Sequence, residues 1–164
     1  MSVFAGLERE HRVFARLARQ CERSLARGEA DARRELAETM RVLLPALVRH
    51  EEVEDLLFRD PAYAARNDAK RILAVVDAQH DEIEALRAEL EALLRDARRC
   101  DFERLKTGVS LFVRKLAFHF ETEENLLWPS YNSLGSRSIR RSLSHEVDER
   151  VDEMETEMRR EKHP

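Results

Sequence analysis

The chain has 164 residues, a length that suits one domain able to bury most of the surface its unfolded chain would expose. Glycine and proline number four each, too few for a turn-rich sandwich or barrel, and aromatic residues make up only 6% of the chain. The net charge is −4 with both signs interspersed, so the chain offers no basic face to phosphates or anionic lipid. Composition therefore favours a helical protein and argues against nucleic acid as a partner.

Membrane and export signals are not evident in the sequence. The longest nearly apolar run covers residues 42–48, which is far short of a membrane span. Glu8 and Arg9 interrupt the first residues before a signal-peptide core could form. We therefore expect a cytoplasmic protein that does not contact membranes. Cys21 and Cys100 lie outside any zinc-binding spacing, so buried or inactive thiols are the simplest interpretation.

Two long helices are predicted in the first part of the chain. The first covers about residues 2–28. The second runs from an N-cap at Asp31 to about Phe58, and Pro61 stops it. Pro45 inside the second helix should bend this helix without ending it, because the apolar pattern continues on both sides.

Two more long helices and an amphipathic tail follow. The third helix covers about residues 68–99, and the fourth runs from an N-cap at Asp101 to Trp128 and Pro129. The domain division is a four-helix bundle over residues 1–132 and a C-terminal helix within residues 133–164. One apolar stripe marks that helix: Ile139, Leu143, Val147, Val151, Met154 and Met158. The C-terminal helix either packs on its own bundle or mediates a homodimer or a contact with another partner.

Six polar residues fall on the otherwise apolar seams of the four bundle helices: His11, His50, Glu54, His80, His119 and Glu123. The last three follow the first three by 69 residues, so the second helix pair repeats the first. Apolar matches between two bundle helices often arise by chance. The repeat also matches two histidines with two histidines and one glutamate with another, and chance explains such polar matches less easily.

These six side chains are predicted to meet at one level of the bundle. In an antiparallel helix pair, residues equally far from the connecting turn lie side by side. His11 and His50 are equally far from the turn between the first two helices, and His80 and His119 from the turn between the last two. Each histidine of the second and fourth helices also has a glutamate four residues later, on the same helix face and about 6 Å away along the axis.

A metal ion explains this arrangement better than a purely structural role. Each ionised carboxylate buried without a cation would cost several kcal/mol. Imidazole and carboxylate donors suit iron, manganese or zinc, and seams without cysteine argue against copper(I) or an iron–sulfur cluster. Six or seven ligands exceed the needs of one tetrahedral ion, so we predict a dinuclear site bridged by Glu54 and Glu123. The alternative is a polar core in which histidine and glutamate hydrogen-bond to each other.

Three further glutamates lie close to the predicted ligands in sequence. Glu84, one turn after His80, is the seventh candidate metal ligand, although its repeat equivalent is Ala15. Glu51 and Glu124 each adjoin a ligand but point about 100° away from it on an ideal helix. We therefore expect these two to border the site or to hydrogen-bond its ligands.

Together these residues resemble the hemerythrin-like family, also described as the HHE cation-binding domain. The resemblance rests on His11, on His50 with Glu54, on His80 and on the segment from His119 to Pro129, and it covers about residues 1–131. It implies an all-α, up-down-up-down four-helix bundle with two iron ions joined by an oxo or hydroxo bridge. Ferritin-like proteins are disfavoured, because their inner helices carry ExxH motifs that these seams lack.

The pattern departs from that of the oxygen-carrying hemerythrins at two places. Those proteins have a second histidine one turn after the third-helix ligand, where this chain has Glu84. Their fourth-helix carboxylate is an aspartate five residues after the histidine, whereas Glu123 follows His119 by four. The pattern looks more like that of bacterial iron-cluster repair proteins and of an iron-sensing F-box subunit. Repair proteins usually carry an additional cysteine-bearing domain, so a stand-alone bundle is expected here.

Three functions are compatible with such a site. The first is a non-haem diiron protein that binds or senses a small ligand, namely O2, NO or peroxide, at an open coordination position. The second is redox chemistry or iron handling, such as peroxide or NO reduction or iron–sulfur cluster repair, which leaves enzymatic activity open. The third is an iron-responsive interaction module whose last helix reports the metal.

Overall fold

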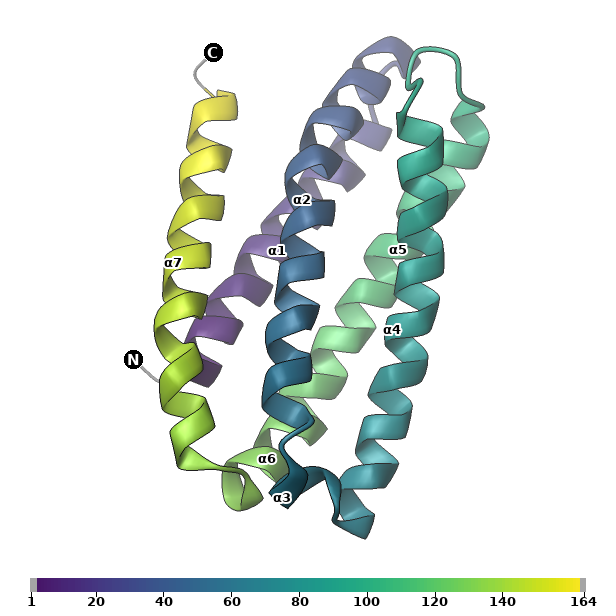
Figure 1. Cartoon of the computed structure of the whole chain (residues 1–164). Coiled ribbons are helices and arrows are strands. Elements are labelled where there is room, and N and C mark those ends of the chain that lie inside the picture. The colour runs from purple at the N-terminus through teal and green to yellow at the C-terminus, as the bar shows by residue number, and fades with distance from the viewer. Residues whose placement is uncertain (1–2, 163–164) are drawn as a thin grey trace.

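The computed structural model describes residues 3–162, which form helices and their connections without a strand. The four long helices are α1 (Val3–Leu25), α2 (Glu29–Phe58), α4 (Asn67–Leu94) and α5 (Phe102–Thr122). Figure 1 shows that they run alternately up and down, and that the short helix α3 (Pro61–Ala64) joins α2 to α4 at the lower end. The predicted all-α bundle is confirmed.

Most helix ends lie near their predicted positions. α2 begins at Glu29, two residues before the predicted Asp31 cap, and Gly28 occupies the N-cap position. It then continues through Pro45 without a break. α4 ends at Leu94, earlier than predicted, because residues 95–99 form turns instead of a last helical turn. The Asp101 side chain caps α5 as predicted, accepting a hydrogen bond from the backbone N–H of Arg104 at 3.1 Å.

The end predicted for the fourth helix at Trp128 and Pro129 is wrong. α5 passes into a π-helical turn, η1 (Glu123–Leu127), and helix then resumes as α6 (Trp128–Leu134). Pro129 lies in the first turn of α6, directly after the π-helical turn, and proline is tolerated in the first turn of a helical segment. The proline therefore starts a new helical segment instead of terminating the old one.

Two apolar clusters fill the bundle, and the polar seam residues lie between them. The cluster toward the α1–α2 and α4–α5 turns includes Phe14, Leu43, Leu47 and Phe112. The cluster toward α3 and α6 includes Leu7, Leu57, Tyr63 and Tyr131. All eight of these side chains are fully buried. The core thus contains a buried polar layer held from both ends by close-packed apolar side chains.

The C-terminal helix α7 (Arg137–Lys162) packs against α1 and α2 (Figure 1). Its stripe residues Leu143, Val147, Val151 and Met154 are buried and belong to the two apolar clusters. Ion pairs flank this stripe: Arg9 lies 3.0 Å from Asp152 and 3.4 Å from Asp148, and Arg16 lies 3.0 Å from Glu155. Within this chain the helix therefore packs on its own bundle, which was the first of the two predicted arrangements.

α1 and α7 approach each other closely at Gly6. A Cβ atom added there would lie 2.7 Å from Cγ1 of Val147, which is too close for two carbon atoms. We expect Gly6→Ala to lower the free energy of unfolding by about 1 kcal/mol, since overpacking costs about 1–3 kcal/mol and alanine regains about 1 kcal/mol of helix propensity. Urea denaturation measures the change. In a double-mutant cycle, Val147→Ala should reduce the cost of Gly6→Ala; strictly additive effects would contradict this packing.

The two cysteines differ in accessibility, which gives a second prediction. Cys21 is fully buried, and burial raises the pKa of its thiol to about 12. At pH 8 it therefore stays protonated and unreactive, because the thiolate is the nucleophile. Cys100 is partly exposed, and its sulfur accepts a hydrogen bond from Nη1 of Arg33 at 3.1 Å. Native protein should react quickly with one equivalent of a thiol reagent, Cys100→Ser should abolish that phase, and rapid labelling of Cys21 would contradict the structure.

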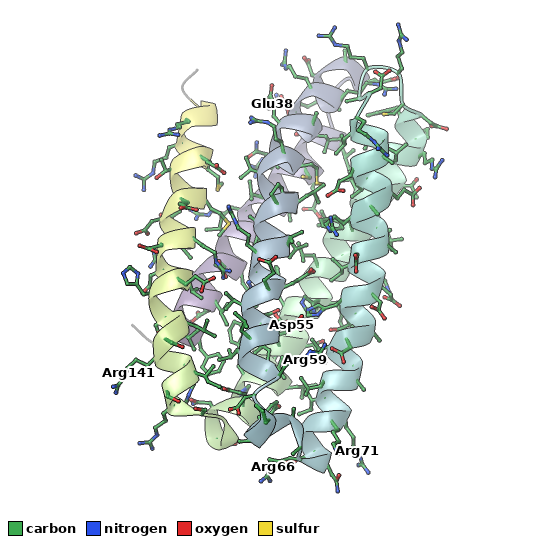
Figure 2. All side chains as sticks on the ribbon, in the orientation of Figure 1. Glu38, Asp55, Arg59, Arg66, Arg71 and Arg141 are labelled. Atoms are coloured by element: carbon green, nitrogen blue, oxygen red, sulfur yellow. The ribbon has the colours of Figure 1, made fainter. Side chains whose placement is uncertain are left out.

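Charged side chains cover the outer faces of the helices. Figure 2 shows Glu38 and Asp55 on α2, Arg59 directly after its last residue and Arg141 on α7, and all four residues are exposed. Between residues 3 and 162, no helix is both long and apolar enough to cross a membrane.

Candidate metal centre

The polar layer of the bundle brings together residues from each of the four long helices. His11 comes from α1, His50 and Glu54 from α2, His80 from α4 and His119 from α5, while Glu123 opens η1. Five of these six side chains are at most 4% exposed, and His80 is 19% exposed. The predicted convergence of the six residues is thus present in the structure.

The four imidazoles form two pairs that meet through their Nε2 atoms. The Nε2 atoms of His11 and His50 are 3.3 Å apart, and those of His80 and His119 are 3.1 Å apart. Two nitrogens bound to one ion at about 2.1 Å and at right angles would be about 3.0 Å apart. Each pair therefore has the spacing of two ligands on a single ion.

Glu54 lies between the two histidine pairs. Its Oε1 atom is 3.4 Å from Nε2 of His50, and its Oε2 atom is 3.6 Å from Nε2 of His80. One carboxylate oxygen therefore faces each pair.

Glu123 is placed in the same way from the opposite side. Its Oε2 atom is 3.3 Å from Nε2 of His11, and its Oε1 atom is 3.0 Å from Nε2 of His119. Two four-residue groups result, and in each the donor atoms lie within 4.8 Å of one another. Each group holds one histidine pair, and both groups share Glu54 and Glu123.

Both carboxylates are buried without the partners that such groups require. All four oxygens of Glu54 and Glu123 are inaccessible to solvent and lack a hydrogen-bond donor. Burial raises the pKa of Glu54, and it raises the pKa of Glu123 to about 7. Burial also opposes protonation of His50, yet the carboxylates of Glu54 and Glu10 outweigh it and raise the pKa of His50 to about 9. The layer thus attracts positive charge, and these donors fit metal ions bound between them.

The outward-facing nitrogens of three imidazoles have hydrogen-bond acceptors. Nδ1 of His11 lies 2.8 Å from Oε1 of Glu124, as expected for a glutamate that adjoins a candidate ligand. Nδ1 of His119 lies 3.2 Å from Oε1 of Gln79, whose amide donates to Oγ1 of Thr122 at 3.0 Å. These acceptors favour a proton on Nδ1, which leaves the Nε2 lone pair free to bind a metal.

His50 is held by a buried ion pair that reaches α7. Its Nδ1 atom lies 2.9 Å from Oε2 of Glu10, and Glu10 pairs at 3.0 Å with Nη2 of Arg150. Arg150 also donates a hydrogen bond to the backbone carbonyl of Arg49. Sequence reasoning missed Glu10, Gln79 and Arg150. The 69-residue repeat could have indicated the first two, because each immediately precedes a histidine ligand candidate.

Aromatic rings close the site on the His11 side. The His11 ring stacks on Phe120 with centroids 3.9 Å apart and lies 4.8 Å from Trp128. Phe14 meets the His50 ring edge to face at 5.4 Å. These contacts fix the two imidazoles and keep water away from that side.

Glu84 lies outside both four-residue groups. Its side chain is 67% exposed and pairs at 3.6 Å with Nη2 of Arg87. The bundle-facing position after His80 belongs to Ile83, which is 1% exposed, because the seam advances by three residues there. The structure therefore does not bring this candidate ligand to the other six residues.

The π-helical turn lies at the site itself. The backbone N–H of Trp128 donates to the carbonyl of Glu123 five residues earlier, which widens the helix by one residue per turn. Glu123 and its neighbour Glu124 both face the polar layer, one between the histidine pairs and the other on His11. Single π-helical turns occur frequently at functional sites, and this one coincides with a candidate bridging ligand.

Comparison with known proteins agrees with this geometry. The model of the hemerythrin HHE cation-binding domain matches residues 2–107 and, a second time, residues 71–162. The two matches begin 69 residues apart, the same interval that separates the repeated histidines and glutamates. No curated protein and no solved structure matches the chain. With its two histidine–glutamate groups and a family match over most of its length, the chain belongs to the hemerythrin HHE cation-binding domain family and is a hemerythrin-like metal-binding protein.

Proposed function

We propose that this protein holds two iron ions and binds or senses a small ligand, namely O2, NO or peroxide, next to them. The observation that carries the proposal is that Glu54 and Glu123 each direct one oxygen toward each histidine pair. His11 and His50 would hold one ion, and His80 and His119 the other. The two carboxylates would bridge the ions.

Iron is the metal that we propose, although manganese and zinc also suit imidazole and carboxylate donors. Each four-residue group supplies two imidazoles and two carboxylates, so each ion would have fewer protein donors than the six of an octahedral site. When bound, an iron pair supplies open coordination positions and a reversible change of oxidation state. The protein residues hold the pair, orient the imidazoles and exclude bulk water.

Differences in burial around the site support one direction of ligand access. The His11 side is closed by Phe120 and Trp128, whereas His80 is the most exposed of the six residues. A molecule of two atoms would therefore approach from the α4 side. Only a small ligand fits this proposal, because the remaining residues of the layer are buried.

The optical spectrum of iron-loaded protein tests this function. The protein is reduced without oxygen, separate samples are exposed to O2, NO or peroxide, and the samples with O2 and NO are then returned to argon. We expect an absorption band that appears with the ligand and disappears when the ligand is removed. A spectrum that does not respond to O2, NO or peroxide would refute small-ligand binding.

A second candidate function is redox chemistry or iron handling at the same site. It is favoured by Glu10 and Glu124, whose carboxylates accept hydrogen bonds from His50 and His11 and increase their basicity, which stabilises oxidised ions. This function predicts an irreversible change of the spectrum with O2. It also predicts catalytic loss of peroxide or NO that Glu54→Ala abolishes, and stoichiometric loss alone would argue against an enzyme.

A further inference from the structure

The two halves of the polar layer differ in the side chains that accept hydrogen bonds from their histidines. Glu10 accepts a hydrogen bond from Nδ1 of His50, and Gln79 accepts one from Nδ1 of His119. Glu10 and Gln79 are separated by the same 69 residues that relate the two halves. The same task is therefore performed by a carboxylate in the first half and by a neutral amide in the second.

The carboxylate in the first half depends on α7. Glu10 is 1% exposed, and each of its oxygens lies 3.0 Å from Nη2 of Arg150. Arg150 is itself buried at 7% exposure. A carboxylate so far from water needs a cation beside it, and the C-terminal helix supplies that cation.

The second half of the polar layer, formed by α4 and α5, is not covered by α7 in the described part of the chain. α7 lies on α1 and α2, whereas the face of α4 and α5 around Gln79 leaves Val75 and Phe118 50% and 59% exposed. For Nδ1 of His80, the described part of the chain provides no hydrogen-bond partner. The outward nitrogens of the first pair thus both face carboxylates, from Glu10 and Glu124, while the second pair has one amide.

A carboxylate that accepts the Nδ1 proton makes the opposite nitrogen a stronger metal ligand than a neutral amide does. We propose, on the basis of the two-ion function above, that the ion at His11 and His50 is bound more tightly than the ion at His80 and His119. Glu10 and Arg150 are the positioning residues responsible. The C-terminal helix thereby contributes to metal binding through Arg150. The ion next to the more exposed His80 is the one that exchanges first.

Half-site variants allow each ion to be measured alone. His119→Ala disables the second site and leaves the ion at His11 and His50, and His50→Ala does the opposite. Fe2+ affinity is measured in both without oxygen, by competition with a coloured chelator. Glu10→Gln, which keeps the shape and removes the charge, should weaken Fe2+ binding by about 10- to 100-fold in the His119→Ala protein. In the His50→Ala protein it should have no effect.

Arg150 is tested with a spectroscopic readout and a conservative variant. The visible spectrum of bound Co2+ reports ligand geometry, and Arg150→Met should change it in the His119→Ala protein while Arg150→Lys preserves it. Because Arg150→Met leaves a charged Glu10 buried alone, the double variant Glu10→Gln/Arg150→Met provides a neutral pair that can fold. Its Fe2+ affinity should equal that of Glu10→Gln alone, since both residues act through one hydrogen bond.

The outcomes separate this inference from the proposed function. Wild-type protein that takes up fewer than two ions would refute the dinuclear function itself. Two bound ions, with Glu10→Gln weakening both half-sites equally or neither, would overturn the inference and leave the dinuclear function standing. Equal affinities of the two half-site variants in the Glu10 wild-type background would overturn it as well.

Discussion

Replacing Glu123 with alanine is expected to remove both metal ions, whereas replacing His119 with alanine removes only one. Glu123 directs Oε2 to His11 and Oε1 to His119, so its loss would take one donor from each of the two proposed ions. His119 belongs to one four-residue group only. Removing a residue that binds the metal directly should weaken metal affinity by more than the loss of about 10- to 100-fold that is typical when a hydrogen-bond partner of a ligand is removed.

Metal per chain, measured by mass spectrometry after iron loading and desalting, distinguishes these variants. Glu54→Ala should behave like Glu123→Ala, because both four-residue groups contain it. Glu84→Ala is the matched control, an exposed glutamate one turn from His80 that should leave the iron content unchanged. Retention of one ion by Glu123→Ala would show that the carboxylate serves a single ion and would contradict the shared arrangement.

Removing the metal with a chelator is expected to lower the thermal midpoint by about 10–20 °C. A ligand at 100 times its Kd stabilises the folded state by about 2.7 kcal/mol, so two ions contribute about 5 kcal/mol. In a protein of this size each kcal/mol shifts Tm by about 2–4 °C. The structural reason is that the four oxygens of Glu54 and Glu123 are buried without a hydrogen-bond partner.

A pair of amide substitutions serves as the control. Glu54→Gln combined with Glu123→Gln removes both buried charges, so the metal-free variant should be more stable than metal-free wild type and insensitive to the chelator. Scanning calorimetry gives the Tm of wild type and of the double variant, each with and without chelator. A wild-type Tm that does not change on metal removal would contradict the account. It would also exclude an iron-responsive interaction module, which additionally requires faster proteolysis of α7 in the metal-free protein.

The positions of the six candidate ligands could be predicted because they depend only on helical geometry. Once four antiparallel helices are assigned, the level of each residue follows from its distance to a turn, and the four-residue spacing from His50 to Glu54 fixes a common face. The repeat made this inference stronger, since His80 and His119 occupy the same levels as His11 and His50. The bundle and its six converging residues follow from those few rules.

Side-chain orientation could not be obtained in the same way. Glu84 and Ile83 are both about one turn from His80, and only packing decides that Ile83 enters the bundle while Glu84 turns to solvent. The roles of Glu10 and Arg150 depend on where α7 docks, and an amphipathic stripe does not specify the surface that it covers. Pro129 shows a related ambiguity, because proline is favoured both after a helix and in its first turn.

The most direct test of the shared His–Glu centre is an anaerobic Fe2+ titration of the wild-type protein, followed by Mössbauer spectroscopy of the oxidised sample. The account predicts two ions per chain with magnetic coupling between them, because both four-residue groups share Glu54 and Glu123, which would bridge the pair. A single ion per chain, or two ions without coupling, would contradict it.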